Sequence, residues 1–144
     1  MKEIYSEILI AASPERVWHI LMDFNSYPAW NPFITRIRGE VSVGSKLSVF
    51  LQPPGGRGME FRPVVLVIAP DHELRWKGKL LMNGIFDGKH VFMIEPNGNN
   101  GVRFIQKEIF KGVLAPIIIS MIGAKTREGF HVMNVALKAR AEKN

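Results

Sequence analysis

The last thirty residues of the chain place side chains at the spacing of one face of a long α-helix. From residue 119 onward this mainly apolar face recurs at steps of three and four, and its members are Ile119, Ile122, Thr126, Phe130, Met133, Leu137 and Ala141. A helix from about Pro116 to Glu142 is roughly 40 Å long at 1.5 Å per residue, which is enough to cross a small domain. The rest of the chain therefore has to fold against this helix.

The preceding segments alternate apolar and polar residues with a period of two, which is typical of an antiparallel sheet. Seven such segments are separated by Gly, Pro and Asn clusters, and they span residues 4–11, 34–41, 46–52, 59–68, 72–80, 86–94 and 102–111. A sheet with one apolar face has to bury that face, and the C-terminal helix is the segment long enough to cover it. The pattern predicts a single α+β domain over residues 1–144, in which a curved sheet of about seven strands wraps around the helix.

Two short helices are expected after the first strand. Ser13 is a good N-cap, Pro14 suits the first helical position, and Glu15 complements the positive end of the helix dipole. Four apolar residues then give this helix a buried face, namely Val17, Ile20, Leu21 and Phe24. Residues 25–33 contain two prolines and two asparagines among aromatic residues, which predicts a short helical turn and a tight connection.

This N-terminal pattern resembles that of a known superfamily. The matching residues follow the first strand and Ser13-Pro14, and they are Val17-Trp18, Leu21, Asp23, Tyr27 and Trp30-Asn31-Pro32-Phe33. Together with the order of elements along the whole chain, they resemble the START-like superfamily of helix-grip proteins, also described as SRPBCC or polyketide cyclase/dehydrase-like. That superfamily includes Bet v 1-like allergens, lipid-transfer domains, aromatase/cyclases and coenzyme Q-binding proteins. Because the fold hosts many unrelated activities, the resemblance implies a pocket rather than a particular reaction.

Three polar residues fall on the apolar face of the last two predicted strands. Residues 97–101, Asn-Gly-Asn-Asn-Gly, form a hairpin loop. A five-residue loop sets His90 opposite Glu108, Phe92 opposite Gln106, and Ile94 opposite Phe104, with directly opposed side chains about 5 Å apart at Cβ. A buried unpaired charge is costly, so Glu108 is expected to have His90 as its partner.

The sequence leaves three interpretations of these polar residues open. The pair of His90 and Glu108 is a satisfied structural contact, or it binds a polar group on an otherwise apolar ligand, or it acts as acid and base in catalysis. A curved sheet around a helix leaves an apolar pocket where side chains do not fill the space. The residues predicted to line that pocket are Phe33, Trp76, His90, Phe92, Phe104, Gln106, Glu108, Phe110, Ile122, Phe130 and Met133.

The leading functional hypothesis is the binding of a small lipophilic molecule between the sheet and the C-terminal helix. An alternative is a polyketide cyclase/dehydratase-like or hydrolase-like enzyme that uses the candidate catalytic residues His90 and Glu108. A third is a lipid-presenting or stress-related interaction module without chemistry. No cofactor or metal is expected, since cysteine is absent and the four histidines lack metal-site spacing. The sequence also lacks a serine in a nucleophile elbow and a Gly-x-Gly-x-x-Gly motif.

Charge and hydropathy restrict the partners and the location of the protein. The net charge of +6 is spread over strand-like segments without interleaved aromatic residues, which favours a solvated sheet face over a nucleic-acid surface. Charges interrupt the first apolar run, so it is not a signal peptide, and we expect a cytoplasmic protein. The uncharged run 112–124 has thirteen residues, too few for stable insertion in a bilayer. Residues 113–122 are predicted to cap the core, with an exposed apolar mouth as the alternative.

Overall fold

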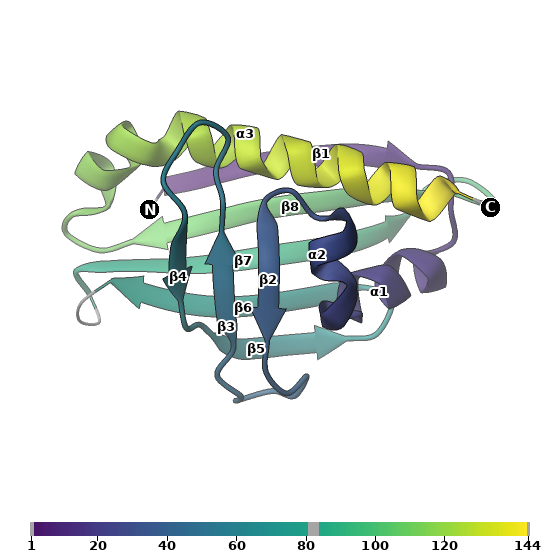
Figure 1. Cartoon of the computed structure of the whole chain (residues 1–144), viewed down its shortest axis with the longest axis horizontal. Coiled ribbons are helices and arrows are strands. Elements are labelled where there is room, and N and C mark those ends of the chain that lie inside the picture. Colours follow the sequence, from purple (N-terminus) through teal and green to yellow (C-terminus); the bar gives the residue numbers. More distant parts are fainter. Residues whose placement is uncertain (1, 81–83, 144) are drawn as a thin grey trace.

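The computed structural model in Figure 1 describes residues 2–80 and 84–143. The chain begins with strand β1 (Lys2–Ile10), helix α1 (Pro14–Met22), the 3-10 turn η1 (Phe24–Ser26) and helix α2 (Tyr27–Trp30). Seven further strands follow, namely β2 (Ile34–Arg38), β3 (Ser48–Leu51), β4 (Met59–Phe61), β5 (Val64–Ala69), β6 (Glu73–Leu80), β7 (Phe86–Pro96) and β8 (Val102–Lys111). The chain ends in helix α3 (Ala115–Glu142).

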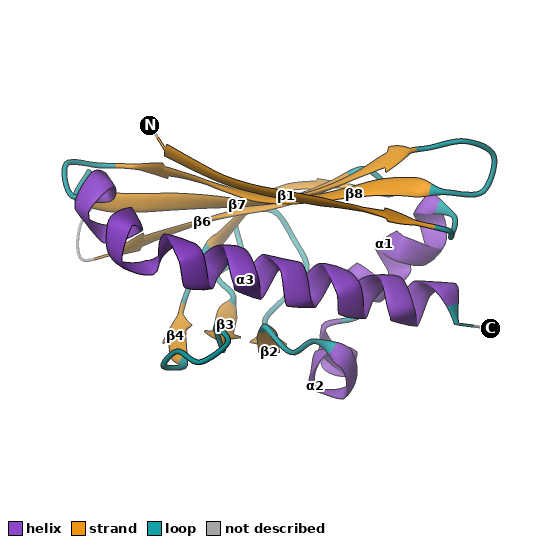
Figure 2. Cartoon of the chain, turned by 90° about the horizontal axis from the view of Figure 1, so that it is seen from above, coloured by secondary structure: helices purple, strands orange, loops and turns teal. Residues whose placement is uncertain are grey.

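The strands form two antiparallel sheets on either side of the interior. Five strands pair in the order β1-β8-β7-β6-β5, and three pair in the order β2-β3-β4. Figure 2 shows that α3 and the small sheet lie on the same side of the large sheet. The loop between β3 and β4 reaches α3, where Lys125 Nζ donates a hydrogen bond to the carbonyl of Gly55 at 2.8 Å. The predicted α+β helix-grip architecture is confirmed.

The structure divides one predicted strand into two. Residues 59–68 were expected to be continuous, but β4 ends at Phe61 and β5 begins at Val64. Pro63 lies at the break, and proline has no N–H to donate to a strand ladder. A single bridge between Lys46 and Val64 still connects the region of the small sheet to the large one. The break explains why eight strands are described where about seven were predicted.

The segment between β1 and β2 is held by local side-chain hydrogen bonds. The backbone N–H of Arg16 donates to Ser13 Oγ at 3.2 Å, which confirms the predicted N-cap. The buried hydroxyl of Tyr27 donates to the carbonyl of Leu21 at 2.6 Å. The side-chain oxygen of Asn31 accepts the backbone N–H groups of the next turn at 3.0 and 2.8 Å. These bonds turn the chain into β2 and direct Phe33 into the interior, where it is 1% exposed.

Helix α3 confirms the predicted stripe only in its second half. Its buried residues there include four of the expected ones, Phe130, Met133, Leu137 and Ala141. In the first half the buried positions are instead Ala115 and Gly123, and Ile122 is 40% exposed. Gly123 faces Ile4 of β1, because a Cβ built on it would lie 3.9 Å from Ile4 Cδ1. The prediction that Ile122 faces the sheet was therefore wrong, since a glycine without a side chain occupies that contact.

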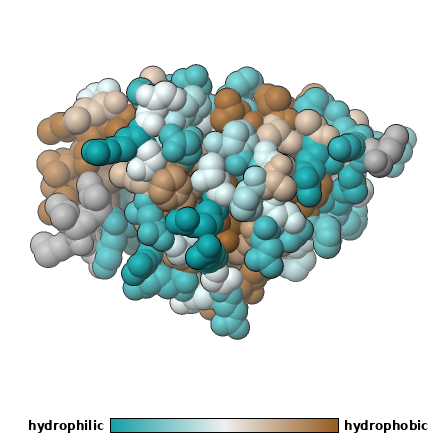
Figure 3. Space-filling model, viewed as in Figure 1, coloured by the Kyte–Doolittle hydropathy of each residue, from teal (hydrophilic) through white to brown (hydrophobic). Residues whose placement is uncertain are grey.

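Several of the apolar residues that precede and begin α3 are exposed. Val113 and Met121 are each 76% exposed, and Ile117 is 60% exposed. Figure 3 shows hydrophobic surface gathered at the end of the molecule where α3 begins. The expectation that residues 113–122 cover the core was wrong for these side chains. None of the helices in residues 2–80 and 84–143 is both long and apolar enough to span a bilayer.

Gly129 allows α3 to approach Phe33, and its replacement by alanine is expected to destabilise the fold. A Cβ at this position would lie 2.4 Å from two ring atoms of Phe33, which is buried and has little room to move. Overpacking costs about 1–3 kcal/mol, whereas alanine gains about 1 kcal/mol in helix propensity over glycine. We expect a net loss of up to about 2 kcal/mol for Gly129→Ala in urea denaturation.

Gly123→Ala is the matched control in the same helix. The nearest atom to a Cβ at this position is Cγ2 of the partly buried Ile119, at 3.3 Å, and this side chain has room to adjust. Alanine here is expected to leave the free energy of unfolding unchanged or to raise it slightly. Equal effects of the two substitutions would contradict the tight packing of α3 on Phe33.

Candidate functional site

The three polar residues predicted on the inner face of the sheet lie together there. The pairing of β7 with β8 sets His90 opposite Glu108, Phe92 opposite Gln106, and Ile94 opposite Phe104, as the hairpin loop predicted. His90 is 1% exposed and Gln106 is fully buried. The side chain of Glu108 is 18% exposed, so Glu108 is the member of the group that solvent reaches.

Aromatic rings surround His90 on three sides. The centroid of its imidazole lies 5.3 Å from the ring centroid of Trp76 on β6, 4.5 Å from that of Phe92 on β7 and 5.1 Å from that of Phe130 on α3. Phe130 in turn packs edge-on against Phe33 at 5.8 Å. Most of the predicted pocket residues are buried. The buried ones are Phe33, Trp76, His90, Phe92, Phe104, Gln106, Phe110, Phe130 and Met133. Glu108 is partly exposed, and Ile122 points away from the cluster.

A chain of hydrogen bonds connects His90 to β1 through α3. His90 Nε2 lies 2.9 Å from Gln106 Oε1, and Gln106 Nε2 donates to Asn134 Oδ1 at 2.8 Å. Asn134 Nδ2 donates to Ser6 Oγ at 3.0 Å, and Ser6 Oγ donates to the backbone carbonyl of Gln106 at 2.7 Å. Sequence reasoning missed Asn134 and Ser6 as members of the site. Two signals pointed to them: Ser6 alternates with the inward-facing isoleucines of β1, and Asn134 lies one helical turn after Phe130.

Burial changes the protonation of both ionisable residues. Desolvation lowers the pKa of His90 to about 4, against the opposing effect of its hydrogen bond with Gln106. Desolvation also raises the pKa of Glu108 to about 7. At neutral pH the imidazole is therefore uncharged, and the carboxyl is close to half-protonated. His90 is thus the neighbour of Glu108, as expected, but the 3.7 Å contact between His90 Nδ1 and Glu108 Oε1 is not a bond between opposite charges.

The absence of a side chain at Gly88 makes room for the Glu108 carboxyl. Gly78 on β6 is opposite Gly88 on β7, and Gly88 is buried. A Cβ on Gly88 would lie 2.5 Å from Glu108 Oε2, so the carboxyl occupies the space that a side chain would fill. Among residues 2–80 and 84–143 there is no cluster of three or more side chains suited to a metal ion.

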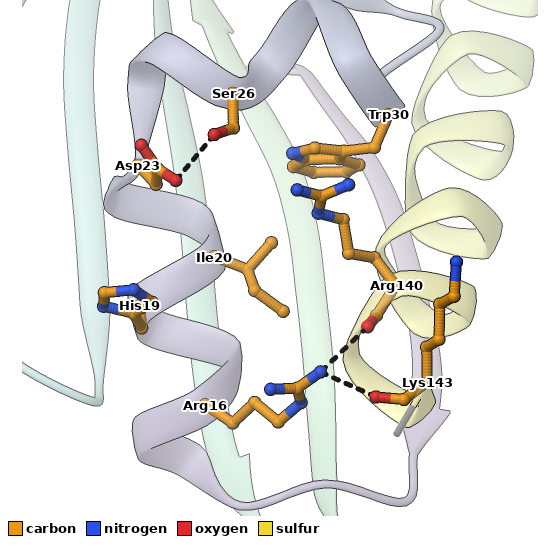
Figure 4. Close-up of a pocket in the computed structure, with 8 residues that line it drawn as sticks. All are labelled: Arg16, His19, Ile20, Asp23, Ser26, Trp30, Arg140 and Lys143. Atoms are coloured by element: carbon orange, nitrogen blue, oxygen red, sulfur yellow. Dashed lines mark hydrogen bonds between the residues drawn. The ribbon is translucent and has the colours of Figure 1, made fainter.

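A surface cleft of about 290 Å³ lies at the other end of α3 and is shown in Figure 4. Its lining residues are Arg16, His19, Ile20, Asp23, Ser26, Trp30, Arg140 and Lys143. Arg16 donates to the carbonyls of Ala141, Arg140 and Lys143 at 2.6, 3.3 and 2.8 Å. Its guanidinium thus satisfies the free carbonyls that end α3 and fastens α1 to this helix. The cleft contains none of the predicted pocket residues, and the Arg16 guanidinium in it already has a structural role.

Comparisons with known proteins found matches over nearly the whole chain. The model of a family described as polyketide cyclase / dehydrase and lipid transport matches residues 1–142. A START superfamily protein from Mycobacterium smegmatis has a TM-score of 0.70 at 20% identity, and the alignment covers 97% of each chain. No curated protein matches the sequence.

Two enzymes of named function share the fold at lower identity. Norcoclaurine synthase from Thalictrum flavum has a TM-score of 0.75 at 16% identity, and the alignment covers 99% of this chain and 87% of the synthase. The di-domain aromatase/cyclase BexL of the BE-7585A biosynthetic pathway has a TM-score of 0.76 at 10% identity, with 99% of this chain and 48% of that protein covered. At these identities the likeness extends to the fold and not to the activity.

Proposed function

Because the chain belongs to the polyketide cyclase / dehydrase and lipid transport family, within the START-like (SRPBCC) superfamily, we propose that it binds a small lipophilic molecule between the large sheet and α3. The observation that carries this proposal is the partly solvated Glu108 next to the buried His90, on a wall that is otherwise aromatic. Buried polar groups are normally satisfied by hydrogen bonds. The Nδ1 atom of His90 has no hydrogen bond within the described part of the chain, so it is free to bind a polar group of a guest.

Access to this site is expected at the end of the molecule where α3 begins. Glu108 lies near the end of β8, four residues before Gly112, and the exposed apolar residues Val113 and Ile117 follow directly. The Glu108 side chain is already 18% exposed to solvent. The rings around His90 contact one another in this structure, so a guest has to displace side chains as it enters. Phe130 is the member of this wall that α3 contributes.

Replacing Glu108 with leucine tests the site directly. We expect it to weaken the binding of a lipophilic ligand with a polar group about tenfold, since one charge-assisted or neutral hydrogen bond is lost. The affinity for a plain hydrocarbon should stay unchanged. Both affinities are measured by displacement of a fluorescent hydrophobic probe. Native mass spectrometry of the purified protein supplies the ligand itself, as a bound mass that denaturation releases.

Glu7→Leu is the matched control, because Glu7 is an exposed glutamate on the neighbouring strand β1 whose side chain is 42% exposed. Its substitution should change neither affinity. An unchanged affinity for polar ligands in Glu108→Leu would remove Glu108 from the site. Failure of every lipophilic probe to bind the wild-type protein would remove the pocket itself.

The same pair of residues supports catalysis as the second candidate function. A neutral imidazole beside a carboxyl whose pKa is about 7 has one group able to accept a proton and one able to donate it near neutral pH. A cyclase, dehydratase or hydrolase acting on a ketone or aromatic substrate would use such a pair. Conversion of the bound molecule into a product of different mass in the native spectra would favour this function over binding alone.

A further inference from the structure

The direction of each hydrogen bond between His90 and Ser6 is fixed by the last bond, the one that Ser6 makes. Ser6 Oγ lies 2.7 Å from the backbone carbonyl of Gln106, and a carbonyl accepts but never donates. The Ser6 hydroxyl must therefore give its only hydrogen to that carbonyl. Its oxygen is then left to accept a hydrogen bond from Asn134, whose side chain lies 3.0 Å away. Asn134 consequently presents its NH₂ group to Ser6.

The same reasoning passes from Asn134 to the imidazole. With its NH₂ group on Ser6, Asn134 turns its oxygen to Gln106, which must donate across the 2.8 Å contact. Gln106 then turns its own oxygen to His90 Nε2, 2.9 Å away. The imidazole must carry its hydrogen on Nε2, because an oxygen acceptor faces that nitrogen. In the neutral ring the lone pair is left on Nδ1.

The lone pair on Nδ1 faces the part of the interior that Glu108 borders. Glu108 Oε1 lies 3.7 Å from Nδ1, which is beyond hydrogen-bond distance. A donor also lacks a partner nearby: Trp76 is 1% exposed, and its Nε1–H is buried without an acceptor among the described residues. Trp76 is directly opposite His90 in the pairing of β6 with β7, with ring centroids 5.3 Å apart. The interior therefore offers an unused acceptor and an unused donor from neighbouring side chains.

From these two unused groups we infer that the guest of this pocket is an apolar molecule carrying an uncharged hydroxyl, an alcohol or a phenol, which donates its hydrogen to His90 Nδ1. A hydroxyl also accepts, so its oxygen remains available to the Trp76 N–H or to a protonated Glu108. A carboxylate only accepts, and it would meet a lone pair and a second carboxyl. A ketone leaves the imidazole unsatisfied. The inference rests on the proposed binding function and adds the chemical class of the ligand.

Naphthalene and two of its derivatives distinguish a hydroxyl-bearing guest from a plain hydrocarbon and from a carboxylate. The probes are 2-naphthol, naphthalene and 2-naphthoate, titrated into the purified full chain at pH 7 and followed by probe fluorescence or calorimetry. We expect 2-naphthol to bind at least tenfold more tightly than either of the other two. In His90→Phe this preference over naphthalene should disappear while naphthalene still binds. His131→Phe, at an exposed histidine of α3, is the control that should retain the preference.

The tautomer is tested without any ligand by ¹⁵N NMR of the imidazole nitrogens. We expect His90 to carry its hydrogen on Nε2 and to have an unprotonated Nδ1, and Gln106→Leu should abolish this fixed state. A hydrogen on Nδ1 in the wild-type protein would overturn the inference. Equal binding of 2-naphthol and naphthalene, or tighter binding of 2-naphthoate, would also overturn it while leaving the proposed function intact. Binding of none of the three probes would overturn both.

Discussion

Glu108→Gln is expected to gain about 3 kcal/mol of stability relative to the wild-type protein when the pH is raised from 4 to 8. The pKa of Glu108 is raised from 4.5 to about 7 by burial. Below pH 4.5 both the folded and the unfolded chain hold the proton, so the folded state contains a neutral carboxyl at no electrostatic cost. As the pH rises through 7 the folded state has to accept a partly buried charge, and that stability is lost. Glutamine has no proton to lose, so the variant escapes this loss.

His90 is expected to behave in the opposite sense. Its pKa is lowered from 6.5 to about 4, so its contribution to stability is present above pH 6.5 and is lost as the pH falls through 4. His90→Gln, which retains an N–H group for Gln106, should therefore gain about 3 kcal/mol relative to wild type between pH 7 and pH 4. Between pH 4.5 and 6.5 the two opposing slopes nearly cancel in the wild-type protein. The comparison of each variant with the wild-type protein therefore isolates the titration of the replaced residue, which the opposing titration of the other residue hides in the wild-type protein.

Urea denaturation at several pH values between 4 and 8 provides the measurement. The quantity compared is the difference in unfolding free energy between variant and wild type. In this difference the contributions of the carboxylates that all the proteins share cancel. Glu7→Gln, on the exposed outer face of β1, is the control for the same change of side chain outside the interior. A Glu108→Gln variant whose difference stays constant from pH 4 to 8 would mean that the carboxyl is well solvated in the folded protein.

The register of the candidate site was predictable from the sequence because a short loop fixes it. Residues 97–101 close the hairpin, and Asn97 N donates to Gly101 O at 2.9 Å. Once the loop is identified, the pairing of His90 with Glu108 follows from the period of two along each strand. The buried half of α3 was predictable for a similar reason, since Phe130, Met133 and Leu137 recur at helical spacing among charged residues.

Other features depend on contacts between distant segments, which local sequence patterns do not determine. The run of apolar residues at the start of α3 has no charged residues to mark its outer face, so its periodicity could not show that Gly123 is buried and Ile122 exposed. Asn134 was missed because a polar residue beside a buried stripe is usually solvated. Its burial depends on partners from two other strands, Ser6 and Gln106. The protonation of His90 and Glu108 likewise depends on how deeply the whole fold buries them.

Phe130→Ala is expected to cost about 3–5 kcal/mol of stability and to make the protein able to bind small aromatic molecules. The Phe130 ring is fully buried and lies against Phe33 and His90, with centroids 5.8 and 5.1 Å away. Its removal leaves a hole directly beside the imidazole, within a wall of other rings. A guest at a hundred times its dissociation constant restores about 2.7 kcal/mol. Added phenol should therefore raise the thermal midpoint of this variant more than that of the wild-type protein.

Leu137→Ala is the matched control, because Leu137 is also fully buried on α3 but lies about two helical turns beyond Phe130. It is expected to lose about 2–5 kcal/mol, and phenol should stabilise it no more than benzene does. Phenol should stabilise Phe130→Ala more than benzene, since only this hole borders the lone pair of His90. If Phe130→Ala does not fold, Phe130→Leu provides a smaller hole for the same comparison. Loss of stability without rescue by either compound would mean that α3 collapses onto the sheet wherever space is made. Such a helix could not retain a guest, because a pocket requires that the wall around His90 keep its shape when one ring gives way.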